Sequence, residues 1–325
     1  MVNADGAILL GERVVVDGHI RRCAVRVQTH VHYDHMSRFT SSKGVHDLVM
    51  HPATRDLLLL EGHPDLAWRD NVYSPQYNEV LRLQGISIEL LNAGHMMGSA
   101  QVAVEYVDGY RVGYSGDFSW PLPKVIQVDE LVVDAAYGSA ASVRRFSQED
   151  AEAEFLQLIS DLLVRGPVTI KAHSGTLHRA AVLLYGAIRH PLIATKRVAD
   201  ELEVYCRYGA VANVQDNIPG TRSYVRLLGR RDPLTRYADP GGATVVLTGF
   251  RMRSEPVLRV SENSYTVCLS DHADFDETLQ YVEQTGAKRV RVDNARHGNG
   301  VELALGIAER LNIESRFDLA DKEVL

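Results

Sequence analysis

The sequence predicts an α/β protein in which an inserted α/β domain interrupts a main domain. Three observations support this fold class: the first third is rich in short strands, strands and helices alternate after Gly138, and the tail alternates again. We expect the first part of the main domain at 1–144, the insert at 145–260 and the C-terminal part of the main domain at 261–325. A chain of 325 residues is long enough for two unequal domains.

Turn residues between apolar runs mark the elements of the first third. Gly11-Glu12 separates two such runs and predicts a hairpin, and Asp108-Gly109 is a strong two-residue hairpin signal. A short helix is expected at 53–61, where Gly62 ends it. The predicted strands of this part are 7–10, 13–16, 23–28, 80–83, 86–91, 101–107, 110–114 and 130–134.

The insert is expected to begin with a helix at Ser147, where Asp150 forms a capping box, and Gly166 ends this helix. The stretch 217–242 is polar and rich in Gly and Arg, so we expect it to be irregular. In the rest of the chain, the predicted strands are 168–172, 243–247, 288–292 and one that begins at Tyr265, and the predicted helices are 176–189, 197–208, 276–285 and 301–311.

Composition and charge narrow the classes of function. An apolar fraction of 45% and a charged fraction of 24% are typical of a soluble globular protein, and no apolar run approaches the roughly 20 residues that cross a bilayer. A net charge of -7 argues against a general polyanion binder, although bound cations would reverse the local sign. There is no visible secretory signal, and three widely spaced cysteines form no disulfide framework, so we expect a cytoplasmic protein without membrane contact.

The strongest chemical signal is a cluster of four potential metal ligands within six residues. His30 and His32 are two apart, so at the end of a strand they can point to one side, and Asp34 and His35 follow as the chain turns. Such a segment can supply ligands to two metal ions at once. The alternative is a surface loop with chance histidines, which the agreement of later segments disfavours.

Three later segments carry matching residue types. His95 lies in a glycine-rich loop after a strand, where small neighbours let the backbone approach a metal. Asp117 ends a strand in a tight turn, where its carboxylate can bridge two cations. His297 follows the strand predicted at 288–292. The sequence therefore predicts a metal centre built from segments far apart in the chain.

These motifs resemble those of metallo-β-lactamase-fold hydrolases and, within them, the β-CASP nucleases. The matches, in chain order, are Asp17, the His30-x-His32-x-Asp34-His35 run, His95, Asp117, motif A at 133–138, motif B at 269–274 and motif C at His297-Gly298. The resemblance implies an αββα metallo-β-lactamase sandwich with an inserted α/β β-CASP cap. The short length and the form of motif B look most similar to the bacterial ligase-associated exonuclease branch.

The resemblance also implies roles for these residues. One divalent ion, Zn²⁺ or Mn²⁺, would be held by His30, His32 and His95, a second by Asp34, His35 and His297, and Asp117 would bridge them. The predicted catalytic residues are Asp34, Asp117, His272 and Asp134. His272 would protonate the leaving oxygen, and Asp134 would hold its tautomer. A structural histidine near a helix N-terminus is the alternative for His272, and Asp17 is expected only to support the site from a turn.

Motif C departs from the family pattern. The family's histidine usually follows its strand directly, whereas here Asn294 stands at that place and His297 comes three residues later. His297 is preferred because the next helix begins at the expected distance from His-Gly. Asp293 and Asn294 remain open as alternatives for the second ion.

A strand-to-helix junction in the insert predicts a nucleic-acid contact. The residues proposed to bind the phosphate are Lys171, Ser174, Gly175, His178 and Arg179. Free N–H groups at a helix N-terminus, together with cationic side chains, favour a phosphate. In the resembled family the insert covers the metal site, which would place this junction over the substrate. An ordinary helix cap with solvated cations is an equally good interpretation.

The sequence therefore predicts a two-metal-dependent nuclease acting on single-stranded nucleic acid, with a DNA exonuclease as the first choice by resemblance. A β-CASP RNase is the near alternative. A small-molecule thioester or lactone hydrolase of the same fold is a second class, and a non-catalytic scaffold subunit is a third. A protein partner in a repair, defence or processing complex is expected, because no separate nucleic-acid-binding module is evident.

Overall fold

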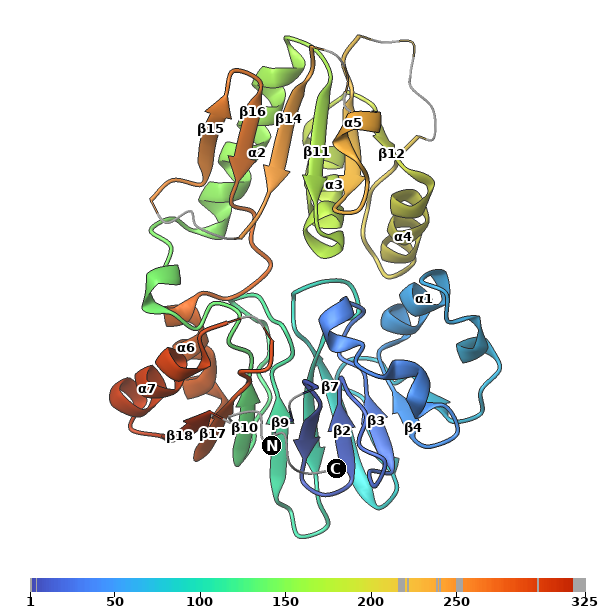
Figure 1. The fold of residues 1–325 in the computed structure, drawn as a ribbon, viewed down its shortest axis with the longest axis vertical. Coiled ribbons are helices and arrows are strands. Elements are labelled where there is room, and N and C mark those ends of the chain that lie inside the picture. The colour runs from blue at the N-terminus through green and yellow to red at the C-terminus, as the bar shows by residue number, and fades with distance from the viewer. Residues whose placement is uncertain are drawn as a thin grey trace. The chain divides into compact units, whose positions relative to one another are not determined.

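The computed structural model describes residues 2–3, 5–215, 220, 222–237, 239, 241–249, 254–296 and 298–317. It divides into two compact units: Met1–Val143 with His272–Leu325, and Arg144–Asp271 (Figure 1). Both units combine sheets with helices, so the predicted α/β class is confirmed. None of the described helices is both long and apolar enough to span a membrane.

The first unit contains two sheets. The five-stranded sheet has the order β1 (Ile8–Leu10), β2 (Val14–Val16), β3 (Val25–Val27), β4 (Asp47–Val49) and β5 (Val72–Tyr73). The seven-stranded sheet has the order β18 (Glu314–Phe317), β17 (Arg289–Val292), β10 (Glu130–Val133), β9 (Arg111–Tyr114), β8 (Ala100–Glu105), β7 (Ile86–Asn92) and β6 (Val80–Leu83). The hairpins predicted at Gly11-Glu12 and Asp108-Gly109 are confirmed as the antiparallel pairs β1–β2 and β8–β9.

One hydrophobic core joins the two sheets. Val14 and Val27 of the smaller sheet cluster with Ile88 and Val102 of the larger sheet. Side chains alternate along a strand, so the other face of the larger sheet packs in a second core. Leu131 of β10 belongs to this second core, together with residues of α6 and α7. The helices of this unit are α1 (Pro52–Leu60), α6 (Phe275–Thr285), α7 (Gly300–Leu311) and the 3₁₀ helices η1 (Tyr33–His35), η2 (Phe39–Ser42), η3 (Pro64–Ala67) and η4 (Ala140–Ser142).

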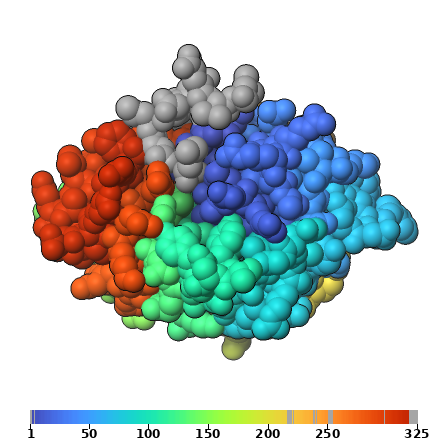
Figure 2. Space-filling view, turned by 90° about the horizontal axis from the view of Figure 1, so that it is seen from below, coloured from blue at the N-terminus to red at the C-terminus, as the bar shows by residue number. Residues whose placement is uncertain are grey.

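The C-terminal segment completes the first unit. β17 pairs in parallel with β10, so a strand from the end of the chain extends a sheet that begins some 200 residues earlier, with Leu131 opposite Val290. In Figure 2 the orange to red atoms of this segment and the blue to green atoms of residues before 143 form one surface. The two parts of the main domain are therefore a single packed body.

The second unit is a six-stranded sheet with helices. The strand order is β12 (Leu192–Ala194), β13 (Val225–Gly229), β11 (Val168–Ala172), β14 (Ala243–Leu247), β16 (Ser264–Val267) and β15 (Val257–Ser261). The helices are α2 (Gln148–Leu163), α3 (Ser174–Ala187), α4 (Lys196–Arg207) and α5 (Leu234–Tyr237). The capping box of Ser147 and Asp150 that was predicted at the start of α2 is present.

Two predictions for this unit need correction. The stretch 217–242 is not wholly irregular, because it contains β13, a central strand paired on both sides, and the short helix α5. The C-terminal boundary at residue 260 is also too early, because β16 pairs in parallel with β14 and therefore belongs to the sheet of the second unit.

Candidate metal centre

The polar residues of the centre follow strand ends of the first unit. β7, β9, β10 and β17 run in the same direction, so their carboxyl ends lie at one edge of the larger sheet. His95, Asp117 and Asp134 follow β7, β9 and β10 at this edge. His30 and His32 follow β3 of the smaller sheet. Residues that are far apart in the sequence are thereby brought to one place.

Three imidazoles surround a common point. The ring centroids of His30, His32 and His95 are 4.9 Å apart in every pair, and the ring planes cross at 81° in every pair. One ligand atom from each ring and one from Asp117 all lie within 4.8 Å of one another. Three converging imidazole nitrogens are the donor set of a His₃ metal site.

A hydroxyl behind His30 orients its ring. Thr29 Oγ1 donates a hydrogen bond to Asp17 Oδ2 (2.5 Å), so at its 3.0 Å contact with His30 Nδ1 it accepts a hydrogen bond from the ring N–H. Burial, followed by the charge of His35, holds the pKa of His30 well below its ordinary value, so the ring is neutral. Its Nε2 is therefore unprotonated, and it is buried without a hydrogen-bond partner among the described residues, which suits a metal ligand.

Asp117 lies between the three imidazoles and His35. Its Oδ2 is 3.7 Å from Nε2 of His30 and 3.7 Å from Nε2 of His95, whereas its Oδ1 is 3.0 Å from Nε2 of His35. The two oxygens of one carboxylate therefore face two different sets of nitrogen atoms. This is the placement that a carboxylate bridging two cations needs.

Asp17 supports the centre through hydrogen bonds to His35 and Thr29. Its Oδ2 accepts a hydrogen bond from His35 Nδ1 (2.7 Å), and its Oδ1 accepts one from the amide of Thr29 (2.7 Å). The His35–Asp17 contact turns Nε2 of His35 toward Asp117. Asp17 has a φ of 51°, a left-handed conformation that Asp tolerates better than most residues, and it is fully buried.

The pKa values of the centre reflect its charges in the absence of a metal. Burial acts against protonation of His35, but Asp117 and Asp17 outweigh it and raise the pKa of His35 to about 10. Burial likewise opposes ionisation of Asp117, yet the charge and hydrogen bond of His35 hold the pKa of Asp117 well below its ordinary value. A protonated His35 thus balances an ionised Asp117, and a bound cation would replace that proton.

His272 and Asp134 lie beside the centre. Nδ1 of His272 is 3.8 Å from Oδ2 of Asp134, and its ring centroid is 4.6 Å from that of His95. Burial and then the charge of Asp117 raise the pKa of Asp134. The side chain of His272 is 19% exposed, so it is accessible to a substrate, as a proton donor must be.

The second set of ligands is less enclosed. Asp34 Oδ2 lies 3.8 Å from His35 Nε2, and the Asp34 side chain is 49% exposed. His297 lies outside the described residues. Of the alternatives for its role, Asp293 accepts hydrogen bonds from Arg296 and from the amide of Ala295, and Asn294 Oδ1 accepts one from the amide of Gly300 (3.2 Å). Both alternatives are therefore engaged elsewhere.

Two buried supports were missed by the sequence analysis. Gln28 donates from Nε2 to the carbonyl oxygens of His30 (2.8 Å) and His35 (3.0 Å) and so braces both ends of the ligand loop. Arg26 in turn donates to Gln28 Oε1 (2.8 Å), and both side chains are fully buried. A buried arginine in an otherwise apolar strand was the available signal.

The predicted phosphate junction of the second unit is held by internal contacts. His178 is fully buried, lies 3.3 Å from Glu201 and stacks on Tyr205, so a phosphate has no access to its ring in this structure. The other predicted side chains also have partners. Lys171 donates to the carbonyl of Asp232, Ser174 donates to Glu201, and Arg179 donates to Glu152 and to the carbonyl of Ser270. Gly175 is buried. Apart from His178, the phosphate site stays a prediction.

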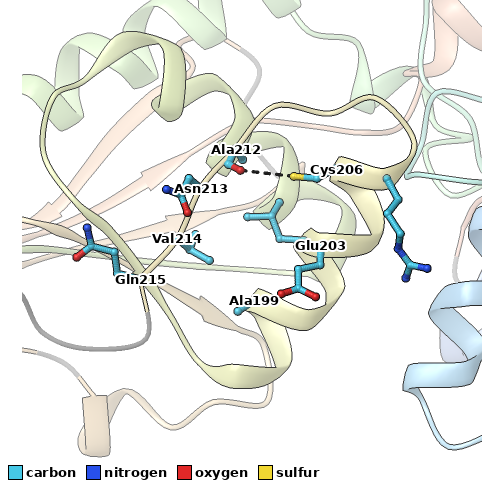
Figure 3. Close-up of a pocket in the computed structure, with 9 residues that line it drawn as sticks. Ala199, Glu203, Cys206, Ala212, Asn213, Val214 and Gln215 are labelled. Carbon is cyan, nitrogen blue, oxygen red and sulfur yellow. Dashed lines mark hydrogen bonds between the residues drawn. The ribbon is translucent and has the colours of Figure 1, made fainter.

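The second unit also has a pocket that no prediction anticipated (Figure 3). It has a volume of about 810 Å³ and lies between α4 and the segment that follows it. Cys206 on α4 donates a weak hydrogen bond from Sγ to the carbonyl of Ala212 (3.5 Å) across this pocket. None of the predicted site residues lines it.

No protein-family model matches the chain. Over 136 residues the chain is 32% identical to the uncharacterized protein in lig 3'region of Acidianus ambivalens, and the match covers 41% of the chain and 96% of that protein. A crystal structure of a protein of unknown function from Enterococcus faecalis V583 has a TM-score of 0.63 at 13% identity, covering 94% of the chain and 82% of that protein. This second likeness concerns the fold alone.

Two more distant relatives have informative names. The RNase J-like protein of Methanocaldococcus jannaschii is 24% identical over 167 residues, which are 43% of the chain and 38% of that protein. Endoribonuclease YSH1 of Saccharomyces cerevisiae is 27% identical over 105 residues, which are 30% of the chain and 13% of that protein. The chain thus matches well under two thirds of either relative. One name indicates likeness to an RNase, and the other names an endoribonuclease.

Proposed function

We infer the function from two premises: the chain belongs to the same family as the Acidianus ambivalens protein, and its relatives include proteins named as RNase J-like and as an endoribonuclease. We propose that it is a two-metal-dependent nuclease that hydrolyses phosphodiester bonds of single-stranded nucleic acid. The observation that carries the proposal is the arrangement of three imidazoles on one side of Asp117 and His35 on the other. The proposed fold is accordingly the metallo-β-lactamase sandwich with a β-CASP insert.

We propose that the centre holds two divalent ions. His30, His32 and His95 would hold one ion, Asp34, His35 and His297 would hold a second, and Asp117 would be available to both. The buried, unprotonated Nε2 of His30 supports the first assignment. Bound divalent ions would activate a water molecule and stabilise negative charge on the phosphate oxygens. Imidazole-rich sets suit Zn²⁺ and carboxylates suit Mn²⁺, and this centre offers both.

The chain's own proton chemistry is assigned to His272 and Asp134. Hydrolysis of a phosphodiester breaks a P–O bond and releases an alkoxide that needs a proton, and a partly exposed imidazole beside the centre can donate it. The Asp134 carboxylate lies 3.8 Å from Nδ1 and would orient the ring so that its other nitrogen faces the substrate. This acid pair is what a small-molecule thioester or lactone hydrolase of the same fold would not require.

The nucleic acid is a separate question. The relatives whose names state a substrate are ribonucleases, so RNA is the favoured substrate. A DNA exonuclease is the second candidate, because motif B resembles the ligase-associated branch and the name of the Acidianus relative refers to lig. A protein partner in a processing, repair or defence complex remains part of the proposal.

A cleavage assay with matched substrates tests the proposal. Single-stranded RNA and DNA of the same sequence, each labelled at the 5′ end, are incubated with chelator-treated protein and with added Mn²⁺ or Zn²⁺. We expect the protein to cleave RNA when metal is added and not when metal is absent. Asp117→Asn should not cleave it. The control variant Asp161→Asn, on the exposed face of α2, should stay active. A ladder from DNA alone would select the exonuclease, and hydrolysis of a thioester with no attack on either polymer would contradict the nuclease.

A further inference from the structure

Arg296 is a buried arginine that joins three segments of the first unit. Its Nε donates to the carbonyl of Asp34 (3.2 Å), its Nη2 donates to the carbonyl of Gly6 (2.6 Å), and its Nη1 donates to the Asp293 carboxylate. Only 7% of the residue is exposed. The guanidinium therefore holds together the N-terminal segment, the ligand loop and the loop that follows β17.

These contacts are specific to a guanidinium. A planar group with five donors in a fixed fork can reach three acceptors in different directions, which an ammonium group cannot do from one position. A buried cation is costly unless it is paired, and Asp293, itself almost fully buried, provides the negative partner. The arrangement is built for geometry as well as charge.

One of the three hydrogen bonds of Arg296 reaches a proposed metal ligand. Asp34, whose backbone it holds, belongs to the proposed second set of ligands. The first set has other supports: Thr29 orients His30, and the amide of His95 donates to Ser99 Oγ (3.2 Å). The three hydrogen bonds of the guanidinium go to Asp34, Asp293 and Gly6, and of these only Asp34 is a proposed ligand. Loss of Arg296 should therefore affect the two metal sites unequally.

We propose that Arg296 is a positioning residue that fixes the backbone of Asp34 so that the second metal ion binds tightly. This inference rests on the proposed two-metal function and deepens it. Supporting residues behind metal ligands change metal affinity by about 10- to 100-fold when they are removed. Because Arg296 belongs to the C-terminal part of the chain, its hydrogen bond with Asp34 makes tight binding of the second ion depend on that part.

Counting bound ions tests this role without an activity measurement. Chelator-treated full-length protein is equilibrated with Mn²⁺ over a range of concentrations, and bound metal per chain is measured by equilibrium dialysis. We expect two ions for wild type. For Arg296→Met we expect one ion with unchanged affinity and a second bound about 10- to 100-fold more weakly. Arg291→Met is the matched control, because Arg291 lies on β17, pairs with Glu130 near the surface and should leave both ions unchanged.

Two further variants keep the test decisive. Arg296→Lys retains the positive charge but lacks the planar set of donors, so it should also bind the second ion more weakly. Wild-type affinity for the second ion in this variant would overturn the positioning role. Asp293→Asn removes the carboxylate partner of Arg296 with little change in volume. This variant replaces Arg296→Met in the test if the Arg296→Met protein does not fold. We expect it to bind the second ion more weakly and the first ion with unchanged affinity. Unchanged binding, or equal weakening of both ions, would overturn the inference. Wild type that binds fewer than two ions would overturn the two-metal proposal itself.

Discussion

At the scale of single residues, polar groups outside the ligand set hold His30, His35 and the loop between them. Thr29 stands behind His30, Asp17 behind His35, and Gln28 behind the loop between them. The ligand types could be predicted, because His and Asp at short spacings have few other uses. Gln28 and Arg26 could not, because their role depends on which carbonyl groups the folded loop turns toward them.

The contact between Asp17 and His35 gives a prediction at this scale. Asp17→Asn removes the negative charge but keeps the shape, and Asn tolerates the positive φ of this position. We expect metal affinity and cleavage rate to fall by about 10- to 100-fold, since the His35 ring loses the partner that orients it. Equilibrium dialysis and the cleavage assay measure the two effects. Asp47→Asn, at a half-buried position outside the centre, is the control, and equal behaviour of the two variants would contradict this role.

The charged state of His35 predicts a pH dependence of stability in the metal-free protein. A histidine whose pKa is raised from about 6.5 to about 10 contributes stability that is complete below about pH 6.5 and is lost as the pH rises through about 10. Asp117 acts in the opposite sense: its pKa is lowered, so its contribution is present above its ordinary pKa and is lost in acid. Chelator-treated protein should therefore become less stable toward pH 10.

Urea unfolding at about pH 6, 8 and 10 checks this pH dependence. His35→Gln serves as the reference, because it lacks the titrating ring and should lose less stability over the same range. Parallel curves for the two proteins would show that His35 is not the source of the effect.

At the scale of elements, the loops after β10 and β17 pass very close to each other. A Cβ built on Gly298 would lie 1.9 Å from the carbonyl oxygen of Ala135, a contact that only a backbone shift can relieve. Gly298→Ala should therefore destabilise the protein by about 1–3 kcal/mol and reduce activity, because Asp134 precedes Ala135 directly. Thermal unfolding provides the measurement.

Gly186→Ala is the matched control for this substitution. Gly186 lies within α3, and a Cβ added there meets nothing within 4 Å, so alanine should leave stability unchanged or slightly raise it through its helix propensity. A tolerated Gly298→Ala would contradict the close approach of the two loops.

The elements differ in how well the sequence predicted them. Both hairpins of the first third and the helix after Ser147 were predicted because two-residue turns and a capping box are local signals. The strand β13 was missed, because its apolar residues lie among arginines and glycines and it gains its place only by pairing with β11 and β12. The sequence analysis also missed the strands β4 and β12.

At the scale of the whole molecule, the chain consists of two compact units, of which the first contains all described residues of the candidate centre. The α/β class followed from alternation, but the end of the insert did not, because β16 is separated in sequence from its sheet partner β14 by a loop and by β15. Local patterns cannot show which sheet a short strand will join. The proposed ligands could be predicted without knowing the strand pairing, because each of their motifs is a local sequence signal.

Metal removal should lower the stability of the folded chain. An ion that binds only the folded state stabilises it by about 2.7 kcal/mol at a concentration 100 times its dissociation constant. We expect the unfolding midpoint to fall after chelation and to recover with Mn²⁺ or Zn²⁺. Asp117→Asn should show little recovery, and a wild-type midpoint that does not respond to any divalent ion would count against a metal centre.

The measurement that tests the central claim most directly is a titration of chelator-treated protein with Mn²⁺ in which bound metal and cleavage of labelled single-stranded RNA and DNA are followed together. The account predicts no cleavage without metal, cleavage that appears as the second ion per chain binds, and no cleavage by Asp117→Asn at any concentration. Full activity in the presence of excess chelator, or in the Asp117→Asn protein, would contradict it.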